Sequence, residues 1–173
     1  MKLVKQIIFQ ARLNEAQPAI AFAGTVATFG MMAKSIEAAV NAIELLALPR
    51  GSMVMLDQRN PLQHMSLMLA LALSGLPSAS VGSTFAIEKA GMMPKLFLTD
   101  RDGVTLPGVE VRVTDERWFA YDPAVPVDYA RLLSLPGFAS PDDVVRYVFS
   151  SGTTGYPKCV ALSERCLETR VAN

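Results

Sequence analysis

A cluster of hydroxyl-bearing residues and glycines near the carboxyl end of the sequence has the chemistry to bind an anion. It follows the apolar run 144–149, and its members are Ser150, Ser151, Gly152, Thr153, Thr154, Gly155 and Lys158. Backbone N–H groups in a glycine-rich turn can face an anion at close range, hydroxyl groups can donate to it, and Lys158 adds a point charge. The cluster therefore predicts a phosphate-binding loop.

The spacing of this loop differs from that of the Walker P-loop. The Walker pattern places four residues between its glycines, whereas only two residues separate Gly152 from Gly155. The stretch 149–158 closely resembles the phosphate-loop signature of the adenylate-forming enzymes, the superfamily of acyl-CoA synthetases, aryl-CoA ligases, luciferases and peptide-synthetase adenylation domains. Every position from Phe149 to Lys158 matches that signature, and Cys159 departs from it because the family usually has glycine there.

The resemblance implies an AMP-forming acid–thiol ligase, similar to acyl-CoA synthetases. In that reaction a carboxylate attacks the α-phosphate of ATP, pyrophosphate leaves, and the acyl group passes to a thiol of coenzyme A or of a carrier pantetheine. The loop would hold the triphosphate, and Mg²⁺ would accompany the ATP. The resemblance places no catalytic residue and no metal ligand within this chain, and it leaves fatty, aromatic and amino acids open as substrates.

The same resemblance implies that the chain is an amino-terminal fragment of such a ligase. Only fifteen residues follow Lys158, so the family's adenine pocket, its magnesium-binding glutamate and its mobile carboxyl-terminal domain have no counterpart here. We therefore expect the fragment to be inactive alone. The alternative is a non-catalytic module that retains the fold and serves nucleotide binding or protein interaction.

Short apolar segments alternate with helical ones along the chain. Thr28 can cap a helix whose apolar residues recur every three or four positions, and Pro61 can start a helix that runs to Leu73. Predicted strands lie at 53–56, 79–81, 95–99 and 144–149, with a short helix at 84–90. This order predicts an α/β fold with a largely parallel sheet and helices on both faces. The resemblance adds that this is the amino-terminal subdomain of the acyl-CoA synthetase-like fold, truncated after the phosphate loop.

The composition divides the chain into three segments. Residues 1–113 form an α/β subdomain of sheet and helices, whose last strand, 109–113, alternates strictly and should lie near an edge of the sheet. Residues 114–143 are a connector in which prolines break any long element. Residues 144–173 comprise a buried strand, the phosphate loop and the segment that follows it.

The composition limits the partners and the compartment. Sixteen basic and sixteen acidic residues cancel, which argues against nucleic-acid binding. The 51% hydrophobic content predicts exposed apolar surface where the fold is truncated, and hence self-association. The apolar stretches are too short to span a membrane, and the apolar run at 1–9 is shorter than a secretory h-region, so we expect a cytoplasmic protein. Cys159 and Cys166 are expected to be free thiols.

Two single residues also have a possible chemical role. His64 is the only histidine, and its apolar helical surroundings predict a structural role in preference to a metal or base site. Cys159 follows Lys158, whose charge could lower the thiol pKa and make the thiol reactive. Simple substitution of the family glycine is the alternative, and we favour it.

Overall fold

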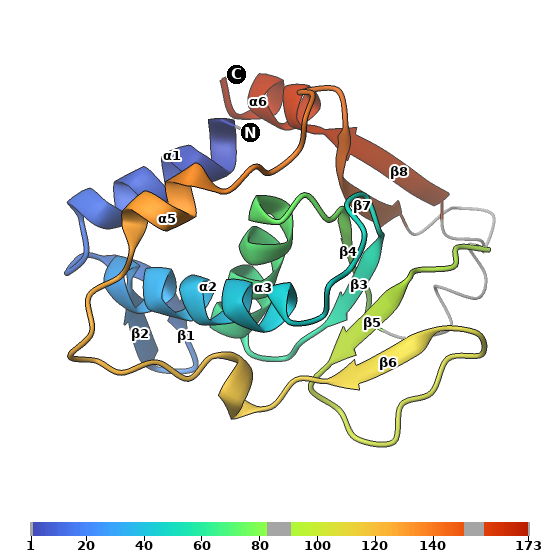
Figure 1. The fold of residues 1–173 in the computed structure, drawn as a ribbon, viewed down its shortest axis with the longest axis horizontal. Helices are drawn as coiled ribbons and strands as arrows, with labels where there is room; N and C mark the ends of the chain where they lie inside the picture. The colour runs from blue at the N-terminus through green and yellow to red at the C-terminus, as the bar shows by residue number, and fades with distance from the viewer. Residues whose placement is uncertain (1, 83–90, 151–157, 173) are drawn as a thin grey trace.

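The structure is a computed structural model that describes residues 2–82, 91–150 and 158–172. Within these ranges the helices are α1 (Lys2–Leu13), α2 (Phe29–Glu44), α3 (Pro61–Leu73), η1 (Glu116–Trp118, a 3₁₀ turn), α5 (Tyr129–Ser134) and α6 (Glu164–Ala172). The strands are β1 (Pro18–Phe22), β2 (Thr25–Thr28), β3 (Val54–Asp57), β4 (Ser78–Ser80), β5 (Leu96–Thr99), β6 (Glu110–Val113), β7 (Val144–Ser150) and β8 (Lys158–Ser163). The strands and helices are arranged around one main sheet (Figure 1).

The main sheet has the strand order β6-β5-β3-β4-β7-β8. Its first five strands are mutually parallel, and β8 returns antiparallel to β7. The predicted largely parallel sheet is thus confirmed. The alternating segment predicted near an edge is β6, the outermost strand beside β5. A separate antiparallel hairpin, β1-β2, packs beside α2.

Local hydrogen bonds start the two central helices where the sequence predicts. The Thr28 hydroxyl accepts from the Met31 backbone N–H at 3.2 Å and begins α2. The Asn60 side chain accepts from Leu62 N–H at 2.9 Å, and Pro61 occupies the first turn of α3. Both caps satisfy donors that have no partner inside the helix.

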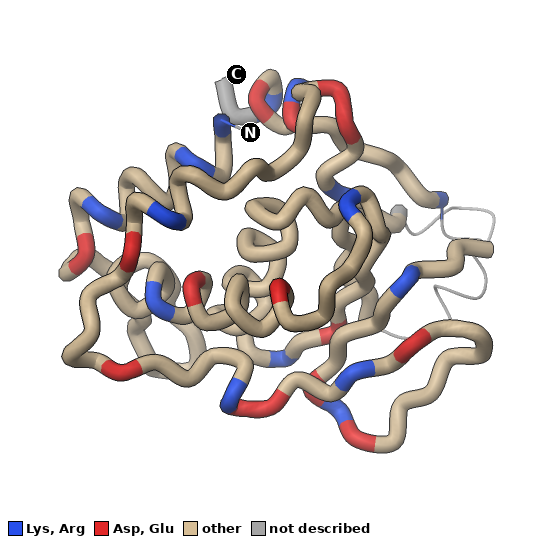
Figure 2. Tube along the Cα trace, in the orientation of Figure 1, with Lys and Arg blue, Asp and Glu red and all other residues tan. Residues whose placement is uncertain are grey.

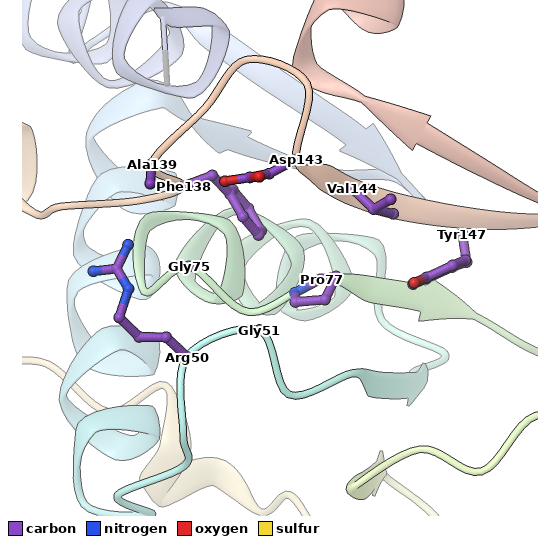
Figure 3. Close-up of a pocket in the computed structure, with 9 residues that line it drawn as sticks. All are labelled: Arg50, Gly51, Gly75, Pro77, Phe138, Ala139, Asp143, Val144 and Tyr147. Carbon is purple, nitrogen blue, oxygen red and sulfur yellow. The ribbon is translucent and has the colours of Figure 1, made fainter.

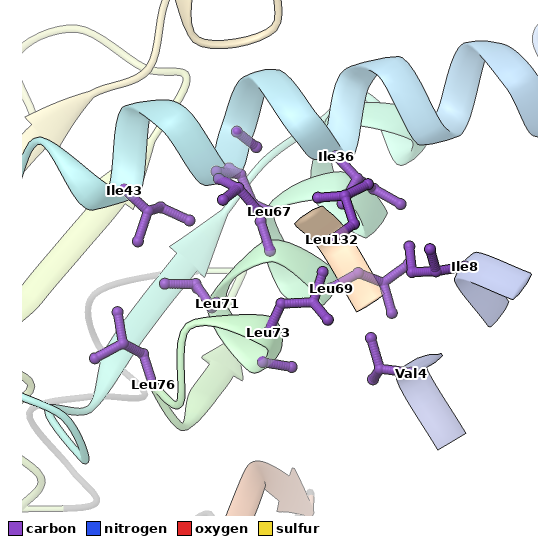
Figure 4. Close-up of a cluster of buried hydrophobic side chains, with 14 of the residues drawn as sticks. Val4, Ile8, Ile36, Ile43, Leu67, Leu69, Leu71, Leu73, Leu76 and Leu132 are labelled. Carbon is purple, nitrogen blue, oxygen red and sulfur yellow. The ribbon is translucent and has the colours of Figure 1, made fainter. Parts of the chain in front are cut away.

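Alternation along the strands divides the interior into two clusters. Val54 and Leu56 of β3 lie in the larger cluster, together with α1, α2, α3 and α5 (Figure 4). Met55 points to the other face and packs with Phe97 and Leu106 in a smaller cluster. The described helices thus cover one face, whereas the described cover of the second face comes from residues 91–109. The helix predicted at 84–90 lies outside the described residues.

The connector 114–143 is held along α2 by a row of polar side chains. Lys34 Nζ donates to the Pro123 carbonyl at 2.5 Å, and Glu37 accepts from Asp128 N–H at 3.1 Å. Over the next two turns of α2, Arg131 donates to Asn41 at 2.8 Å and to Glu44 at 2.7 Å. These α2 positions recur every three or four residues and therefore share one helix face. The connector thus packs along α2, and β7 belongs to the same sheet as β3, β4, β5 and β6. The division of the chain at residues 113 and 143 stays a prediction.

Acidic and basic residues are interspersed along the described trace (Figure 2). Several of them pair across the surface, including Arg59 with Asp100 at 3.2 Å and Arg165 with Asp142 at 2.6 Å. Among the described residues, no helix is long and apolar enough to cross a membrane.

Candidate functional site

The two ends of the predicted phosphate loop are held by a strand pair. β7 ends at Ser150 and β8 begins at Lys158, and these two residues are partners in the antiparallel register. Lys158 is exposed. The remaining predicted ligands, Ser151, Gly152, Thr153, Thr154 and Gly155, lie outside the described residues. The described geometry thus places the ends of the segment side by side at one end of a two-stranded ribbon.

That end belongs to the carboxyl edge of the parallel sheet. Since β3, β4 and β7 run parallel, their last residues Asp57, Ser80 and Ser150 lie towards the same edge. Open α/β sheets bind ligands outside the carboxyl ends of their strands, where successive connections pass to opposite faces. The connection after β3 is α3, on the larger cluster, whereas Val104 and Leu106 of the connection after β5 pack in the smaller cluster. Because the chain passes from β3 to β4 on one side and from β5 to β6 on the other, the switch point lies between β3 and β5.

A partly buried arginine anchors β7 to the neighbouring strand. Arg146 donates from Nη1 to Ser78 Oγ at 2.9 Å and from Nη2 to Ser80 Oγ, both on the neighbouring strand β4. Its two hydrogen-bond partners are hydroxyls, and no carboxylate among the described residues pairs with it. Burial lowers the pKa of Arg146, yet a guanidinium stays charged at any physiological pH. A cation is therefore fixed four residues before the loop begins.

His64 extends this network from α3. Its Nδ1 lies 3.4 Å from the Gln58 carbonyl, and its Nε2 contacts the hydroxyl of Ser80. With the proton on Nδ1, Nε2 accepts from that hydroxyl, which in turn accepts from Arg146. Burial is the main cause that lowers the pKa of His64, and the nearby Arg146 adds to it, while the Gln58 carbonyl and Asp57 oppose the shift. The ring is thus neutral near pH 7, and it links α3 to β4.

Hydrogen bonds also tie the ends of β3 and β5 together. Arg101 bridges to the Asp57 carboxylate at 3.3 Å. The side chain of Gln58 donates to Thr114 at 2.8 Å, and its own buried carbonyl oxygen has no partner among the described residues. The described ranges contain no group of three or more His, Cys, Asp or Glu side chains that could hold a metal ion.

Two residues that follow the loop, Cys159 and Glu164, have contacts that indicate a structural role. Cys159 is exposed opposite Phe149, and partial burial of its thiol raises its pKa. A reactive thiol beside Lys158 would need a lowered pKa, so this shift of the Cys159 pKa is in the opposite direction. Glu164, at the start of α6, is buried and accepts from Leu3 N–H at 3.0 Å. It joins the two ends of the described chain.

Sequence reasoning missed Arg146 and its serine partners. The available signal was a charged residue inside the apolar strand 144–149, because an arginine in such a position must find hydrogen-bond partners on a neighbouring element. Which element supplies them could not be known without the strand order, since Ser78 and Arg146 are 68 positions apart.

A cavity of about 360 Å³ lies at the opposite edge of the same strands (Figure 3). Its lining includes Gly51, Pro77 and Val144, which precede or begin β3, β4 and β7. Arg50 reaches across it and donates to the Gly137 carbonyl. This cavity is therefore separate from the carboxyl edge where the loop begins.

Comparison of the whole fold with solved structures gives close matches at low identity. VinN in complex with 3-methylaspartate matches with a TM-score of 0.68 and 18% identity, over 93% of this chain and 47% of VinN. FmoA3, a nonribosomal peptide synthetase with α-methyl-L-serine-AMP bound, matches with a TM-score of 0.73 and 18% identity, over 98% of this chain and 19% of its own. The N-terminal subdomain of NpsA from Klebsiella oxytoca matches with a TM-score of 0.68 and 18% identity, over 94% of this chain and 42% of its own.

The chain has the fold of the amino-terminal part of an adenylation domain. This adenylation-type fold confirms the resemblance that the loop sequence suggested, at the level of the fold. The chain spans about half of the VinN chain and less than half of the NpsA subdomain. No protein-family model and no curated protein sequence matches it.

Proposed function

We propose that this chain is the amino-terminal part of an ATP-dependent carboxylate ligase of the adenylate-forming type. One observation carries the proposal: the ten-residue signature 149–158 occurs in an adenylation-type fold, at the junction of β7 and β8. Two independent properties, a local motif and a global topology, thus point to the same class of enzyme.

In the proposed reaction ATP is a substrate that carries the leaving group, and Mg²⁺ accompanies it. The loop's task is to donate hydrogen bonds to the phosphates and to offset the charge that develops on pyrophosphate. Hydroxyl and amide donors would come from Ser150, Ser151, Gly152, Thr153, Thr154 and Gly155. Lys158 would add the positive charge. The strand pair β7-β8 would hold both ends of the loop so that these donors are oriented before ATP arrives.

We propose that the adenylation step requires polypeptide beyond these 173 residues, so that the chain alone is inactive. The supporting fact is coverage, because the chain matches 47% of VinN and 42% of the NpsA subdomain. Once formed, the acyl-adenylate would pass its acyl group to a thiol of coenzyme A or of a carrier pantetheine. The solved Adenylation–PCP di-domain NpsA-ThdA, which has a similar fold over 94% of this chain, favours the carrier as acceptor.

We also propose that the protein works in the cytoplasm. Both cysteines are unpaired, Cys159 being exposed and Cys166 partly exposed. Free thiols persist in a reducing compartment.

The first experiment captures the native polypeptide from its source with an antibody to this chain and measures its intact mass. A mass well above 18.7 kDa, with carboxylate-dependent ATP–pyrophosphate exchange by the captured protein, would support the proposal. A native product near 18.7 kDa that binds pyrophosphate without catalysing exchange would favour the non-catalytic module.

A second experiment tests the loop itself in the 173-residue chain. Inorganic pyrophosphate should slow amide hydrogen exchange in residues 150–158. Lys158→Ala should weaken pyrophosphate binding about tenfold or more, in line with loss of a charge-assisted contact. Lys95→Ala is the matched control, because Lys95 is also exposed but precedes β5 at the opposite edge of the sheet. Equal affinities for the two variants would contradict the assignment of the loop.

A further inference from the structure

The β7-β8 ribbon, which carries the two ends of the phosphate loop, is joined to the rest of the sheet by a short stretch of backbone pairing. The register of β7 with β4 ends at the pair Ala79 and Tyr147. The register of β7 with β8 continues to the pair Ser150 and Lys158. Within the described part of the chain, residues 148–150 therefore have a strand partner on β8 but none on β4.

Side chains hold the two faces of this ribbon unequally. On one face, Tyr147 and Phe149 pack against the smaller cluster. Val148 points to the opposite face, because side chains alternate along a strand. Val148 is 44% exposed, and its register partner Val160 is 49% exposed. Apolar packing therefore secures the end of β7 on the first face and contributes little on the second.

Arg146 supplies a polar contact on this second face. It lies two residues before Val148, and its guanidinium donates to Ser78 Oγ at 2.9 Å and also to Ser80 Oγ. Ser80 lies one residue beyond the last register pair of β4 with β7, so the side chain extends the connection towards the carboxyl edge. A planar guanidinium that donates to two hydroxyls fixes direction as well as distance. Because His64 of α3 contacts the same Ser80 hydroxyl, the ribbon is fixed relative to both β4 and α3.

We propose that Arg146 is the positioning residue of the phosphate loop. By fixing the direction of β7 where its backbone pairing with β4 ends, the guanidinium sets the place of Ser150 and Lys158, the two described ends of the loop. Arg146 acts through the ribbon and not by contact with the anion, since about 13 Å of extended strand separates it from Ser150. The inference rests on the proposed function, because the position of the loop matters only if the loop binds phosphate.

The test measures the affinity of the 173-residue chain for inorganic pyrophosphate by calorimetric titration, under conditions in which each variant is folded. Arg146→Met removes both donors and should weaken pyrophosphate binding about tenfold, because the donors of the loop are no longer held in place before the anion arrives. Arg146→Lys keeps the charge but cannot reproduce the planar fork, so its affinity should lie between those of the wild type and Arg146→Met. An Arg146→Lys chain that binds as tightly as the wild type would overturn the proposal, because the charge alone would then be sufficient.

Ser80→Ala separates position from charge in a second way, and it decides the question if Arg146→Met does not fold. The variant keeps the guanidinium and removes one of its two acceptors, and it should weaken pyrophosphate binding at least about threefold. Unchanged affinity in Ser80→Ala would refute the positioning role.

Gly51→Ala is the control for lost stability. Gly51 precedes β3 at the opposite edge of the sheet and has a φ of +79°, so alanine there destabilises the fold but should leave pyrophosphate affinity unchanged. An equal loss of affinity in Gly51→Ala would mean that general destabilisation explains the effect, and the proposal would fail. A wild-type chain that does not bind pyrophosphate would refute the assignment of the loop and this inference with it, whereas wild-type affinity in Arg146→Met would refute this inference alone.

Discussion

At the scale of single residues, the carboxyl edge is organised by Arg146 rather than by the residues that first attract notice. The guanidinium bonds two hydroxyls of β4, and one of these contacts the neutral ring of His64. The prediction that His64 is structural fits this arrangement. The pKa of the His64 ring depends mainly on its burial and also on the partly buried charge of Arg146 beside it.

The first prediction concerns that pKa. His64 is the only histidine, so its ring signals in a proton NMR titration are unambiguous. We expect its pKa below 6.5, and we expect Arg146→Met to raise it because a nearby positive charge is removed. The same variant leaves the buried Ser78 hydroxyl without this donor and should cost about 1–3 kcal/mol of stability. Arg112→Met, on the edge strand β6, should leave the His64 titration unchanged; a shift of similar size there would refute the assignment.

At the scale of elements, close packing of three loops holds the amino edge of the sheet. Gly75, after α3, has a φ of +72°, and a Cβ there would lie 2.6 Å from the Gly137 carbonyl oxygen. The Gly51 backbone N–H donates to the Gly75 carbonyl at 3.0 Å, and Arg50 donates to the Gly137 carbonyl. The loops before β3 and β4 and the end of the connector therefore meet at one point.

Two glycine variants separate backbone strain from steric overlap. Gly51→Ala introduces a left-handed alanine in open space, at φ +79° with no atom within 4 Å, and should cost about 1–2 kcal/mol. Gly75→Ala carries the same conformational cost and also forces a backbone carbonyl to move, so its cost should exceed that of Gly51→Ala by at least about 1 kcal/mol. Urea denaturation of both variants measures the difference. Equal losses of unfolding free energy in the two variants would mean that the backbone at Gly137 shifts at no energetic cost.

At the scale of the whole molecule, the lowered pKa of His64 makes stability depend on pH. The unfolded chain binds the proton with the ordinary pKa of 6.5, whereas the folded chain binds it more weakly. Unfolding therefore takes up a proton at intermediate pH, and stability rises with pH in that range. The contribution of His64 is complete above pH 6.5 and is lost progressively as the pH falls towards the folded-state pKa.

The corresponding measurement is the free energy of unfolding as a function of pH, with His64→Gln as the comparison. The wild-type chain should lose stability on acidification below pH 6.5 more steeply than the variant, because glutamine does not titrate. Parallel curves for the two chains would show that His64 protonation is not linked to folding.

Exposed apolar surface on the β7-β8 ribbon bears on the association state. Val148 and Val160 are register partners and are 44% and 49% exposed, and β8 is an edge strand. We expect concentration-dependent self-association by sedimentation, reduced by Val148→Thr together with Val160→Thr. Val26→Thr, at a 51% exposed site on β2, is the control. A wild-type chain that stays monomeric at high concentration would contradict the expectation.

The exposure of Val148 also corrects the expectation that 144–149 is a buried strand. Val145 is buried, but β7 lies one strand from the edge of the sheet, and the described helices leave part of its face open. An apolar run predicts a strand from its composition alone. How deeply that strand is buried depends on its neighbours, which the run does not contain.

The sequence by itself determined the features that depend on neighbouring residues. Thr28 and Asn60 start helices because their side chains bond amides two or three positions ahead, and the alternation of short apolar segments was sufficient to predict a largely parallel sheet. The motif 149–158 suggested the class of fold that the comparisons then confirmed. Helices α1 and α6 and the β1-β2 hairpin were not predicted. The hairpin turns at Ala23 and Gly24, both at positive φ, and alanine gives little signal for such a turn.

Only the tertiary structure decided which distant residues meet. The donor from Leu3 to Glu164 joins positions 161 apart, and Arg146 reaches Ser80 across 66 positions. Such contacts depend on strand order and helix placement, which arise from burying all the apolar faces together and not from any local stretch. The carboxyl-edge network belongs to this class. Local hydrogen bonds and periodicity therefore set the elements of this chain, and collective packing set its sites.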